Sequence, residues 1–459
     1  MWEALGFTKD PYDASPLEPK PGDVDLLIGR QQQGVAFCST LDSSNRGMLV
    51  ISGVPGVGKT SFFNIYQYLL ESQNTFFGPK LLADRVRCHV QPYDEPRSIA
   101  LRSLQTLCRS VEEYCRLNGH SNLPQNKKIL DWLSAQGKSG YTLGINLLGV
   151  GGSFGRTVSV PSVSDVSFEG IADLIVAVKN EAMQNLEVSG VQIALDNIEN
   201  LGDQNIAPIL MTFRDTLFSI DNVWWILIGQ SGFGSFLQTQ DSRVSDKLGG
   251  QPIELSPISF EELDKAISKR VERFHSSAKG KSPLPSCIHK LLYDASHGEI
   301  RFVFKYSSII CQKVISRVRD SVIRELKPEE MHMSQEEFNG RVDSEIGHML
   351  VEEQIPSDLA KEVLKETIRS EVEGLGLRNK ERRILKQIGS EGGARPKDFK
   401  NFGLETLQDF SSNYLSKFHK QDLLARRQEG RSVVYTLRGV VALASEFGLL
   451  EEHSSGNSS

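Results

Sequence analysis

The chain has 459 residues, of which 39% are hydrophobic and 24% charged, and its formal net charge is −6. This composition is typical of a soluble globular protein, and the length allows two to four domains. No apolar run is long enough to span a bilayer, which argues against a membrane protein. The first residues lack the charged-then-apolar layout of a signal peptide, so we expect a cytoplasmic location. The six scattered cysteines contain no Cys-x-x-Cys pair and favour reduced side chains over a zinc site.

The net charge hides an asymmetry along the chain. Residues 378–438 contain fourteen Lys and Arg against seven Asp and Glu, which gives this segment a charge of +7. The rest of the chain therefore carries a charge of −13. A basic C-terminal segment on an acidic body indicates a nucleic-acid partner better than the total charge does.

The N-terminal residues 1–25 are rich in proline and aspartate. They predict an extended segment that wraps around the protein instead of packing into it. A compact nucleotide-binding core is predicted from 26 to 257. Early in this core, an amphipathic helix is expected to run to about Leu41.

The most specific motif of the sequence follows the apolar run 48–51. It fits the P-loop pattern Gly-x-x-x-x-Gly-Lys-Ser/Thr at every fixed position, and a helical stretch continues from it. Glycines in such a loop let successive backbone N–H groups turn toward phosphate oxygens at the positive end of a helix dipole. We expect Lys59 to reach the terminal phosphates of ATP and the Thr60 hydroxyl to ligate Mg²⁺. The candidate nucleotide-binding residues here are Gly53, Val54, Pro55, Gly56, Val57, Gly58, Lys59, Thr60 and Ser61.

Short apolar strands alternate with helices through the remainder of the core. Such alternation predicts an α/β fold in which a parallel sheet is covered by helices on both faces. A Gly-rich insertion at 137–167 fits a hairpin and a surface loop equally well. The predicted strands are 85–90, 191–196, 224–228 and 253–255, and the predicted helices are 98–117, 171–186 and 208–218.

A second candidate for the nucleotide site is Asp196, which ends the apolar run 191–195. An acid at the end of a buried strand is the Walker B arrangement, which holds Mg²⁺ during phosphoryl transfer. The alternative is an aspartate that merely begins a turn. The P-loop well upstream favours the metal-binding interpretation.

Beyond the core the pattern becomes wholly helical. We expect a helical lid at 258–324, an acidic helical linker at 325–376, a winged-helix domain at 377–450 and a disordered tail at 451–459. The winged helix is predicted because three helices are followed by a hairpin. In its third helix, the side chains expected to point inward are Leu407, Phe410, Leu415 and Phe418.

This third helix would enter the major groove of DNA, and the hairpin would lie on the backbone. The candidate phosphate contacts are Lys417, Lys420, Arg426, Arg427 and Arg431. The alternative is a winged helix that serves protein contacts or packing.

Further motifs make the chain resemble the AAA+ ATPases and, with the C-terminal module, the origin-recognition-like initiator ATPases and their bacterial relatives. The run Ile28-Gly29-Arg30 is similar to their adenine-side box. Residues 226–231 look like the sensor-1 strand, with Gln230 or Ser231 as the polar tip near the γ-phosphate. The resemblance covers most of the chain, although only the P-loop is sharply specific.

The resemblance also implies roles for two arginines. Residues 241–244 resemble the Ser-Arg motif, from which Arg243 would reach the ATP of a neighbouring subunit. Residues 298–301 resemble sensor 2, from which Arg301 would act within its own subunit. A guanidinium fork stabilises charge on the transferring phosphoryl group. Hydrolysis would then require assembly of a homo-oligomer through the ATP site.

One residue departs from the family pattern. The family has a catalytic glutamate directly after the Walker B aspartate, where this sequence has Asn197. An amide positions water but cannot take its proton, and loss of a general base costs roughly 10²- to 10⁴-fold in rate. Glu199 is on the same side of the chain by strand alternation and is the candidate substitute. ATP binding is therefore a safer expectation than fast hydrolysis.

The leading interpretation is a Mg-ATP-binding AAA+ ATPase with slow basal turnover, which assembles in a nucleotide-dependent way and acts on double-stranded DNA. The rival is a nucleotide-gated signalling or defence switch that recruits a partner protein through its winged helix. Asn197 favours the rival, and the basic balance after Arg378 favours the first. A plain transcription regulator is a third possibility, but it would not need a complete ATPase core.

Overall fold

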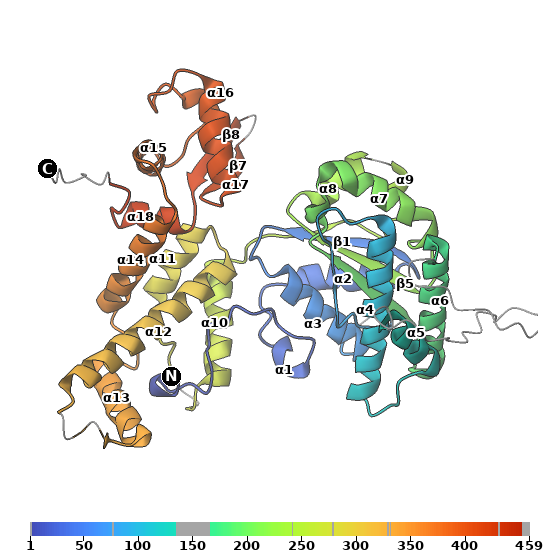
Figure 1. Cartoon of the computed structure of the whole chain (residues 1–459), viewed down its shortest axis with the longest axis horizontal. Coiled ribbons are helices and arrows are strands. Elements are labelled where there is room, and N and C mark those ends of the chain that lie inside the picture. Colours follow the sequence, from blue (N-terminus) through green and yellow to red (C-terminus); the bar gives the residue numbers. More distant parts are fainter. Residues whose placement is uncertain are drawn as a thin grey trace, which may run out of the picture. The chain divides into compact units, whose positions relative to one another are not determined.

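The computed structural model of the chain describes residues 2–75, 78–134, 166–240, 242–277, 280–327, 330, 332–429 and 432–451 (Figure 1). Its contacts divide the chain into two compact units. One is Pro16–Ser256, and the other combines Met1–Ser15 with Pro257–Ser459. The hairpin or loop predicted within 137–167 lies outside the described residues, except for Val166 and Ser167. Of the predicted tail, only Glu451 is described.

The unit Pro16–Ser256 is built on a parallel sheet, as predicted. Its strand order is β2-β4-β5-β1-β6, and β3 also pairs with β4. The three central strands β1, β4 and β5 are buried along their whole length, which is why their sequences read as near-continuous apolar runs. The strands are β1 Gly47–Gly53, β2 Leu81–Leu82, β3 Cys88–His89, β4 Gly190–Asp196, β5 Val223–Gly229 and β6 Ile253–Leu255.

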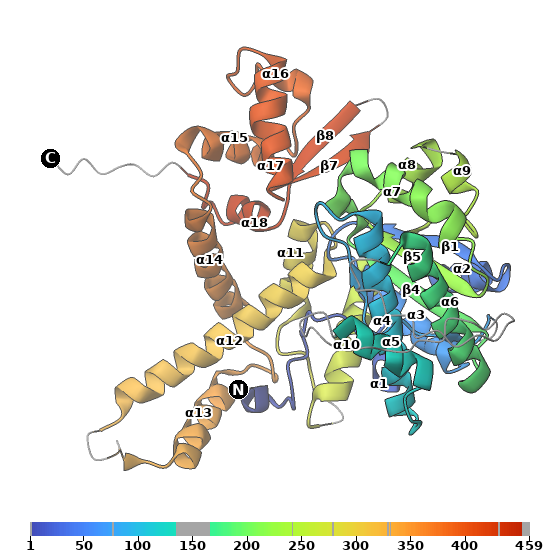
Figure 2. The ribbon, with the colours of Figure 1, turned by 45° about the vertical axis from the view of Figure 1, so that its right-hand side comes forward.

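Helices cover both faces of this sheet (Figures 1 and 2). Alternate residues of β1 enter different cores: Met48 and Val50 join the larger cluster with α4 to α7, while Leu49 and Ile51 pack with α2 and α3. The helices of this unit are α1 Pro21–Val24, α2 Gln31–Asp42, α3 Lys59–Glu71, α4 Pro96–Leu117, α5 Pro124–Ser134, α6 Phe168–Asn185, η4 Ile198–Leu201, α7 Asp203–Thr216, α8 Phe233–Gln240 and α9 Ser242–Ser245.

The second unit begins with helices that pack around α12, the long helix of 26 residues. Its neighbours α11, α13 and α14 all contact it. α10 and α13 each begin with a Ser capping box, in which the serine and a glutamate three residues later satisfy the first backbone N–H groups. The helices are α10 Phe260–Phe274, α11 Ser286–Ser296, α12 Ile300–Glu325, α13 Gln335–Met349 and α14 Ser357–Gly374.

The first 15 residues of the predicted N-terminal segment 1–25 pack into this helical unit, so the prediction that the segment wraps without packing is wrong. It opens with η1 Trp2–Leu5, and Phe7 then forms a backbone bridge with His275 after α10. Phe7 is 1% exposed and Tyr12 is fully buried. These two aromatic side chains anchor a segment whose proline and aspartate content alone predicted an extended conformation.

Tyr12 is held by a buried polar cluster. Its hydroxyl lies 2.6 Å from Ser282 Oγ and 3.0 Å from His289 Nε2, and it accepts a hydrogen bond from the Leu284 N–H at 3.3 Å. Burial lowers the pKa of His289 to about 4, so its ring is neutral at physiological pH. The cluster therefore joins the N-terminal segment to α11 without any buried charge.

We expect Tyr12→Phe to lower the free energy of unfolding of the helical unit by about 1–3 kcal/mol, because buried partners on Ser282 and His289 lose a hydrogen bond. Urea unfolding followed by circular dichroism measures the change. The matched control is Tyr93→Phe, since Tyr93 is 95% exposed and its hydroxyl is in water. Equal free energies of unfolding for Tyr12→Phe and Tyr93→Phe would show that the Tyr12 hydroxyl does not anchor the segment.

The C-terminal module follows the predicted order of three helical segments and a hairpin. α18 packs against α11, α14 and α15, which ties the module to the helical unit. The strands β7 and β8 pair antiparallel, with Arg426 opposite Tyr435 and Arg427 opposite Val434. The elements are α15 Asn379–Ser390, η6 Pro396–Asp398, α16 Leu407–Asp409, η7 Phe410–Ser416, α17 Lys417–Lys420, β7 Leu424–Glu429, β8 Ser432–Leu437 and α18 Val440–Glu446.

The third helical segment, α16 to α17, is not a regular α-helix. Its middle part η7 is a π-helix, in which each turn contains more residues than an α-turn. Phe410, Leu415 and Phe418 are fully buried, as predicted. The prediction that Leu407 points inward is wrong, since its side chain is 47% exposed. An α-helical period extrapolated across a π-segment places the first turn incorrectly.

Candidate functional site

The P-loop connects the carboxyl end of β1 to the N-terminus of α3. A Cβ atom at Gly53 would lie 2.6 Å from the Leu255 carbonyl oxygen, so only glycine fits where the loop leaves the sheet. Gly58 caps α3 with φ +95°, which glycine adopts at little cost. The loop is thereby folded back over the start of a 13-residue helix, whose first N–H groups lack intrahelical partners. This geometry suits an anion.

The polar side chains of the loop occupy distinct positions. Lys59 Nζ donates to the carbonyl oxygens of Gly53 at 2.7 Å and Val54 at 3.3 Å, both within the loop itself. Thr60 is half-buried in the first turn of α3. Ser61 Oγ accepts a hydrogen bond from the Leu17 N–H at 3.1 Å, which ties the start of this unit to the P-loop helix.

Arg30 braces the P-loop, a role that sequence reasoning missed. Arg30 is 4% exposed, and its guanidinium donates to the carbonyl of Val57 at 2.9 Å and to that of Ser256 at 2.8 Å. Ile28, the candidate adenine contact, is half-buried two residues earlier. Arg30 belongs to the motif that suggested the adenine-side box, but its buried position was not predictable from the motif.

The Walker B candidate Asp196 ends β4, two strands from β1 in the sheet. Its Oδ1 accepts a hydrogen bond from the Asn197 N–H at 3.0 Å. Its Oδ2 faces Arg87 Nη1 at 3.4 Å and His89 Nδ1 at 3.7 Å. His89 is paired in register with Asp196 across β3 and β4. Neither Arg87 nor His89 was among the sequence candidates.

The residues after Asp196 turn away from the strand. Asn197 is exposed and has φ +61° in the left-handed region, which asparagine tolerates better than most residues. Glu199 lies in η4, so the inference that strand alternation places it on the side of Asn197 is wrong: the strand has already ended. Among the described residues, Glu199 Oε2 is buried and has no hydrogen-bond partner.

The sensor-1 candidate Gln230 follows β5 directly and is exposed. The next residue, Ser231, hydrogen-bonds Glu254 of β6, which also accepts a hydrogen bond from Ser52 of β1. The Gly232 N–H approaches the same carboxylate at 3.5 Å. Glu254 therefore fixes the loop after β5 next to the strand that leads into the P-loop.

The two candidate arginines lie in different units. Arg243 is on α9, and its side chain is outside the description. Arg301 is exposed in the first turn of α12, in the helical unit. Glu299, the N-cap residue of this helix, forms an ion pair of 2.7 Å with Arg438, which follows β8 directly. The candidate sensor-2 residues are thus linked to the C-terminal module.

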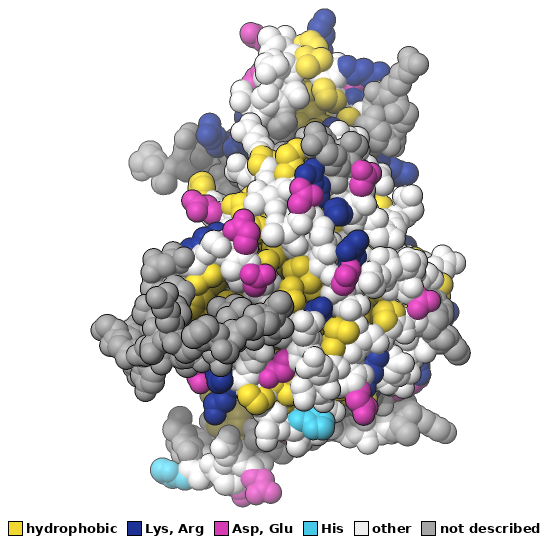
Figure 3. Space-filling view, turned by 90° about the vertical axis from the view of Figure 1, so that its right-hand side faces the viewer, with side chains coloured by type: hydrophobic (Ala, Val, Ile, Leu, Met, Phe, Trp, Pro, Cys, Tyr) yellow, Lys and Arg dark blue, Asp and Glu magenta, His cyan; other side chains and the backbone are white. Residues whose placement is uncertain are grey.

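The candidate DNA contacts are only partly arranged as predicted. Lys420, Arg426 and Arg427 are exposed, whereas Lys417 is paired with Glu381 of α15. Arg431 lies outside the described residues. Sequence reasoning also missed five exposed cations of this module, which lie on α15, on η6 and in the loop after it: Lys380, Arg383, Lys386, Lys397 and Lys400. Lys386 is paired with Glu451. On the face of the molecule in Figure 3, by contrast, Lys and Arg side chains are interspersed with Asp and Glu.

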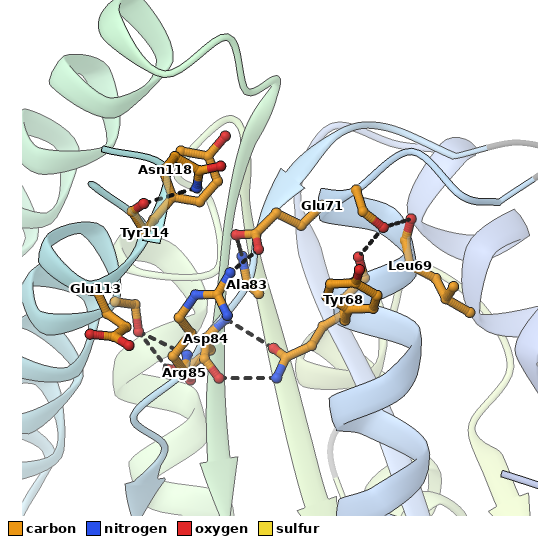
Figure 4. A network of polar contacts seen from close by, with 12 residues as sticks. Tyr68, Leu69, Glu71, Ala83, Asp84, Arg85, Glu113, Tyr114 and Asn118 are labelled. Atoms are coloured by element: carbon orange, nitrogen blue, oxygen red, sulfur yellow. Dashed lines mark hydrogen bonds and ion pairs between the residues drawn. The ribbon is translucent and has the colours of Figure 1, made fainter. Parts of the chain in front are cut away.

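A buried polar network around Asp84 joins the P-loop helix α3 to β4, the strand that ends at Asp196. Figure 4 shows the part of this network around Asp84, Arg85 and Glu71. Gln67 Nε2 of α3 donates to the Asp84 carbonyl at 3.1 Å, and the Asp84 N–H donates to Gln67 Oε1 at 2.9 Å. The Asp84 carboxylate accepts hydrogen bonds from the Ala194 N–H of β4 at 2.6 Å and from Ser110 Oγ of α4 at 3.3 Å. Burial raises the pKa of Asp84 to about 7, against the opposing effect of these hydrogen bonds.

This raised pKa predicts how stability depends on pH. Asp84 ionises in the unfolded chain near pH 3.8 but in the folded protein only near pH 7, so its contribution to stability is lost as pH rises from 3.8 through 7. Asn at this position keeps an acceptor for the Ala194 N–H, and its amide N–H can donate to Ser110 Oγ once that hydroxyl, which donates to Asp84 in the wild type, rotates. We expect Asp84→Asn to be more stable than the wild type at pH 8 by a few kcal/mol, with a smaller difference at pH 5.

Urea unfolding at both pH values measures this difference. The control is Asp131→Asn, at a carboxylate exposed on α5. A difference between Asp84→Asn and the wild type that is the same at pH 5 and pH 8 would contradict the assignment of a raised pKa to Asp84.

The P-loop after β1, and an acid ending β4 of the same parallel sheet, define the class of this unit as a P-loop nucleotide-binding fold. The hard oxygen donors of Thr60 and Asp196 suit Mg²⁺. Elsewhere, the described residues contain no group of three or more His, Cys, Asp or Glu that could hold a metal ion. No helix in the described ranges is long and apolar enough to cross a membrane.

No family model matches the chain. Over 98 residues, the chain is 33% identical to the ORC1-type DNA replication protein 2 of Haloarcula marismortui. The match covers 21% of this chain, and it spans about a quarter of the length of that curated relative, 24%. The predicted resemblance to origin-recognition-like proteins is confirmed by this similarity.

Three solved structures align with this chain over nearly its whole length at low identity. The Aeropyrum pernix ORC2 protein, in ADPNP-ADP complexes, has a TM-score of 0.49 at 11% identity, with 97% of both chains covered. The Pyrobaculum aerophilum Cdc6p structure has a TM-score of 0.42 at 14% identity, with 97% of this chain and 98% of that chain covered. The Aeropyrum pernix ORC1 protein in complex with DNA has a TM-score of 0.41 at 14% identity, with 96% and 97% covered.

Proposed function

We propose that this chain is a Mg-ATP-binding AAA+ ATPase that assembles in a nucleotide-dependent way and acts on double-stranded DNA. The observation that carries the proposal is the P-loop fold: backbone N–H groups at the start of α3, closed by Gly58, with Asp196 at the end of β4. The partial similarity to an ORC1-type DNA replication protein supports the choice of DNA as the substrate.

Each residue of the site has a distinct task in this proposal. The P-loop N–H groups hold the phosphate oxygens, and Lys59 exchanges its contacts with Gly53 and Val54 for the terminal phosphates. Thr60 and Asp196 hold Mg²⁺, which neutralises charge on the β- and γ-phosphates when bound. Arg30 holds the P-loop in position through its hydrogen bond to the Val57 carbonyl.

Assembly would complete the site. Arg301 supplies a guanidinium from the same chain, and Arg243 supplies one to the ATP of a neighbouring copy. The ion pair between Glu299 and Arg438 supports a link between nucleotide state and the C-terminal module, since Glu299 is two residues from Arg301. Nucleotide-dependent DNA binding would follow from such a link.

Hydrolysis is expected to be slow, because Asn197 cannot act as a base. Glu199 is the first acid along the chain after Asp196, and its Oε2 is a buried acceptor without a hydrogen-bond partner among the described residues. We expect Glu199→Gln to reduce the remaining turnover by roughly 10²-fold or more without loss of ATP affinity. Phosphate release under single-turnover conditions measures this. Unchanged turnover in Glu199→Gln would place the base elsewhere.

The second candidate function is a nucleotide-gated switch that recruits a partner protein through the C-terminal module. Asn197 favours it, because a switch needs nucleotide binding more than rapid hydrolysis. The pairing of Lys417 with Glu381 also favours it, since one candidate phosphate contact is already engaged. In this case the protein would bind ATP and change its assembly, but would not bind DNA.

Sizing the full chain by light scattering, with and without Mg-ATP and duplex DNA, separates the two functions. The proposed function predicts a larger species with ATP and a further increase in mass with DNA. The switch predicts growth with ATP alone. A monomer under all conditions would contradict nucleotide-dependent assembly.

A further inference from the structure

A basic side chain, that of Arg87 directly before the neighbouring strand β3, faces the candidate Walker B carboxylate. Cys88 and Val90 of the β3 segment point into the core beneath α4, which leaves Arg87 and His89 on the opposite face. Asp196 lies on this same face, because its neighbour Leu195 packs with Cys88 and Val90. The face is the one that the P-loop helix α3 covers.

The contact between Arg87 and Asp196 is partly shielded from water. The two side chains are 16% and 10% exposed, and the shortest distance between them is 3.4 Å. The pair is therefore screened less by salt than a surface ion pair. Oδ1 of Asp196 is already bonded to the Asn197 N–H, so Arg87 faces the remaining oxygen, Oδ2.

Of the two arginines in this segment, Arg87 is the one that faces Asp196. Arg85, two residues earlier, is paired with Glu71 instead. The positive charge of Arg87 also acts on Asp84, whose pKa it lowers against the effect of burial. His89 is further from Asp196, at 3.7 Å, and its side chain is 56% exposed.

We propose that Arg87 is a positioning residue of the nucleotide site, which holds the Asp196 carboxylate in the nucleotide-free protein and competes with Mg²⁺ for it. This inference rests on the proposed Mg-ATP binding. A charge-assisted contact to a carboxylate must be broken or rearranged before the same carboxylate serves a divalent cation. The positive charge of Arg87 in addition repels the incoming cation. Both effects raise the Mg²⁺ concentration that tight ATP binding requires.

The test is calorimetric titration of ATP into the full-length protein at Mg²⁺ concentrations from zero, with EDTA present, to saturation. The variants are Arg87→Ala and Arg87→Lys, and the matched control is Arg109→Ala, an exposed arginine of α4 in the same unit. We expect Arg87→Ala to reach half of its full gain in ATP affinity at an about tenfold lower Mg²⁺ concentration, equivalent to about 1.4 kcal/mol. Arg87→Lys keeps the charge but loses the planar fork, so a smaller decrease of about threefold is expected.

The outcomes separate this inference from the proposed function. If the wild type binds ATP but Arg87→Ala and Arg87→Lys require as much Mg²⁺ as Arg109→Ala or more, the inference is overturned and ATP binding stands. If the wild type binds no ATP at any Mg²⁺ concentration, the proposed function fails and the inference with it. Thermal unfolding checks that each variant is folded. Should Arg87→Ala not fold, Arg87→Lys alone decides, because it retains the charge beside Asp84.

Discussion

Replacing Lys59 by alanine is expected to reduce ATP affinity at least about a hundredfold, to below detection, while leaving the fold intact. Lys59 contributes a charged donor to the terminal phosphates, and losing charge-assisted hydrogen bonds of this kind costs about 3 kcal/mol. Its Nζ donates to the carbonyls of Gly53 and Val54 within its own loop. Lys59 belongs to neither hydrophobic cluster of this unit, so we expect the core to stay intact in the variant.

Calorimetric titration of Mg-ATP measures the affinity, and thermal unfolding without nucleotide tests the fold. Lys128→Ala is the matched control, because Lys128 is exposed on α5 of the same unit. We expect the control to bind ATP like the wild type. Normal ATP affinity in Lys59→Ala would remove the P-loop assignment and, with it, the proposed function.

The second large effect concerns the hairpin of the C-terminal module. Neutralising Arg426 and Arg427 together removes two exposed cations of β7. Each phosphate contact contributes about 0.9 to the slope of log affinity against log salt on duplex DNA, so the slope should become shallower by up to about 1.8. Affinity for duplex DNA should fall at low salt, and ATP binding should be unchanged.

Fluorescence anisotropy of labelled duplex DNA at several salt concentrations measures the slope. The double variant Lys361→Ala with Lys365→Ala is the control, because both lysines are exposed on α14, away from the hairpin in sequence. An unchanged slope in the Arg426 and Arg427 variant would show that the hairpin does not contact phosphates. Absence of salt-dependent binding by the wild type, with and without ATP, would favour the protein-recruiting switch.

The core of the nucleotide site was predictable because its signals are local. The octapeptide predicts the P-loop, and the apolar runs of β1, β4 and β5 predict both that these segments are strands and that they are buried. The segment 85–90 was predicted as a strand, but its mixed polar sequence does not indicate which residue Arg87 faces. That Arg87 faces Asp196 depends on which strand pairs with β4 and in what register, and a single sequence does not contain that information.

Predictions failed where a local rule was extended past the end of its element. Strand alternation was carried from Asp196 to Glu199, although the chain turns at Asn197 into η4. Helical periodicity was carried through the π-helix η7 to Leu407, which is exposed. The prediction for the N-terminal segment was wrong for another reason. The partners of Tyr12 lie far along the chain, so the sequence near Tyr12 gives no signal of them.

The order of the chain also has a consequence for how the protein is made. Tyr12 precedes Ser282 by 270 residues and His289 by 277, and the whole unit Pro16–Ser256 is translated in between. At about 5–20 residues per second, the two aromatic anchors wait roughly 14 to 55 seconds for their binding site to emerge from the ribosome. During this time Phe7 and Tyr12 lack their partners, while the unit Pro16–Ser256 can already fold. The helical unit closes last on the segment that was synthesised first, and a fragment that begins at Pro257 would lack that segment altogether.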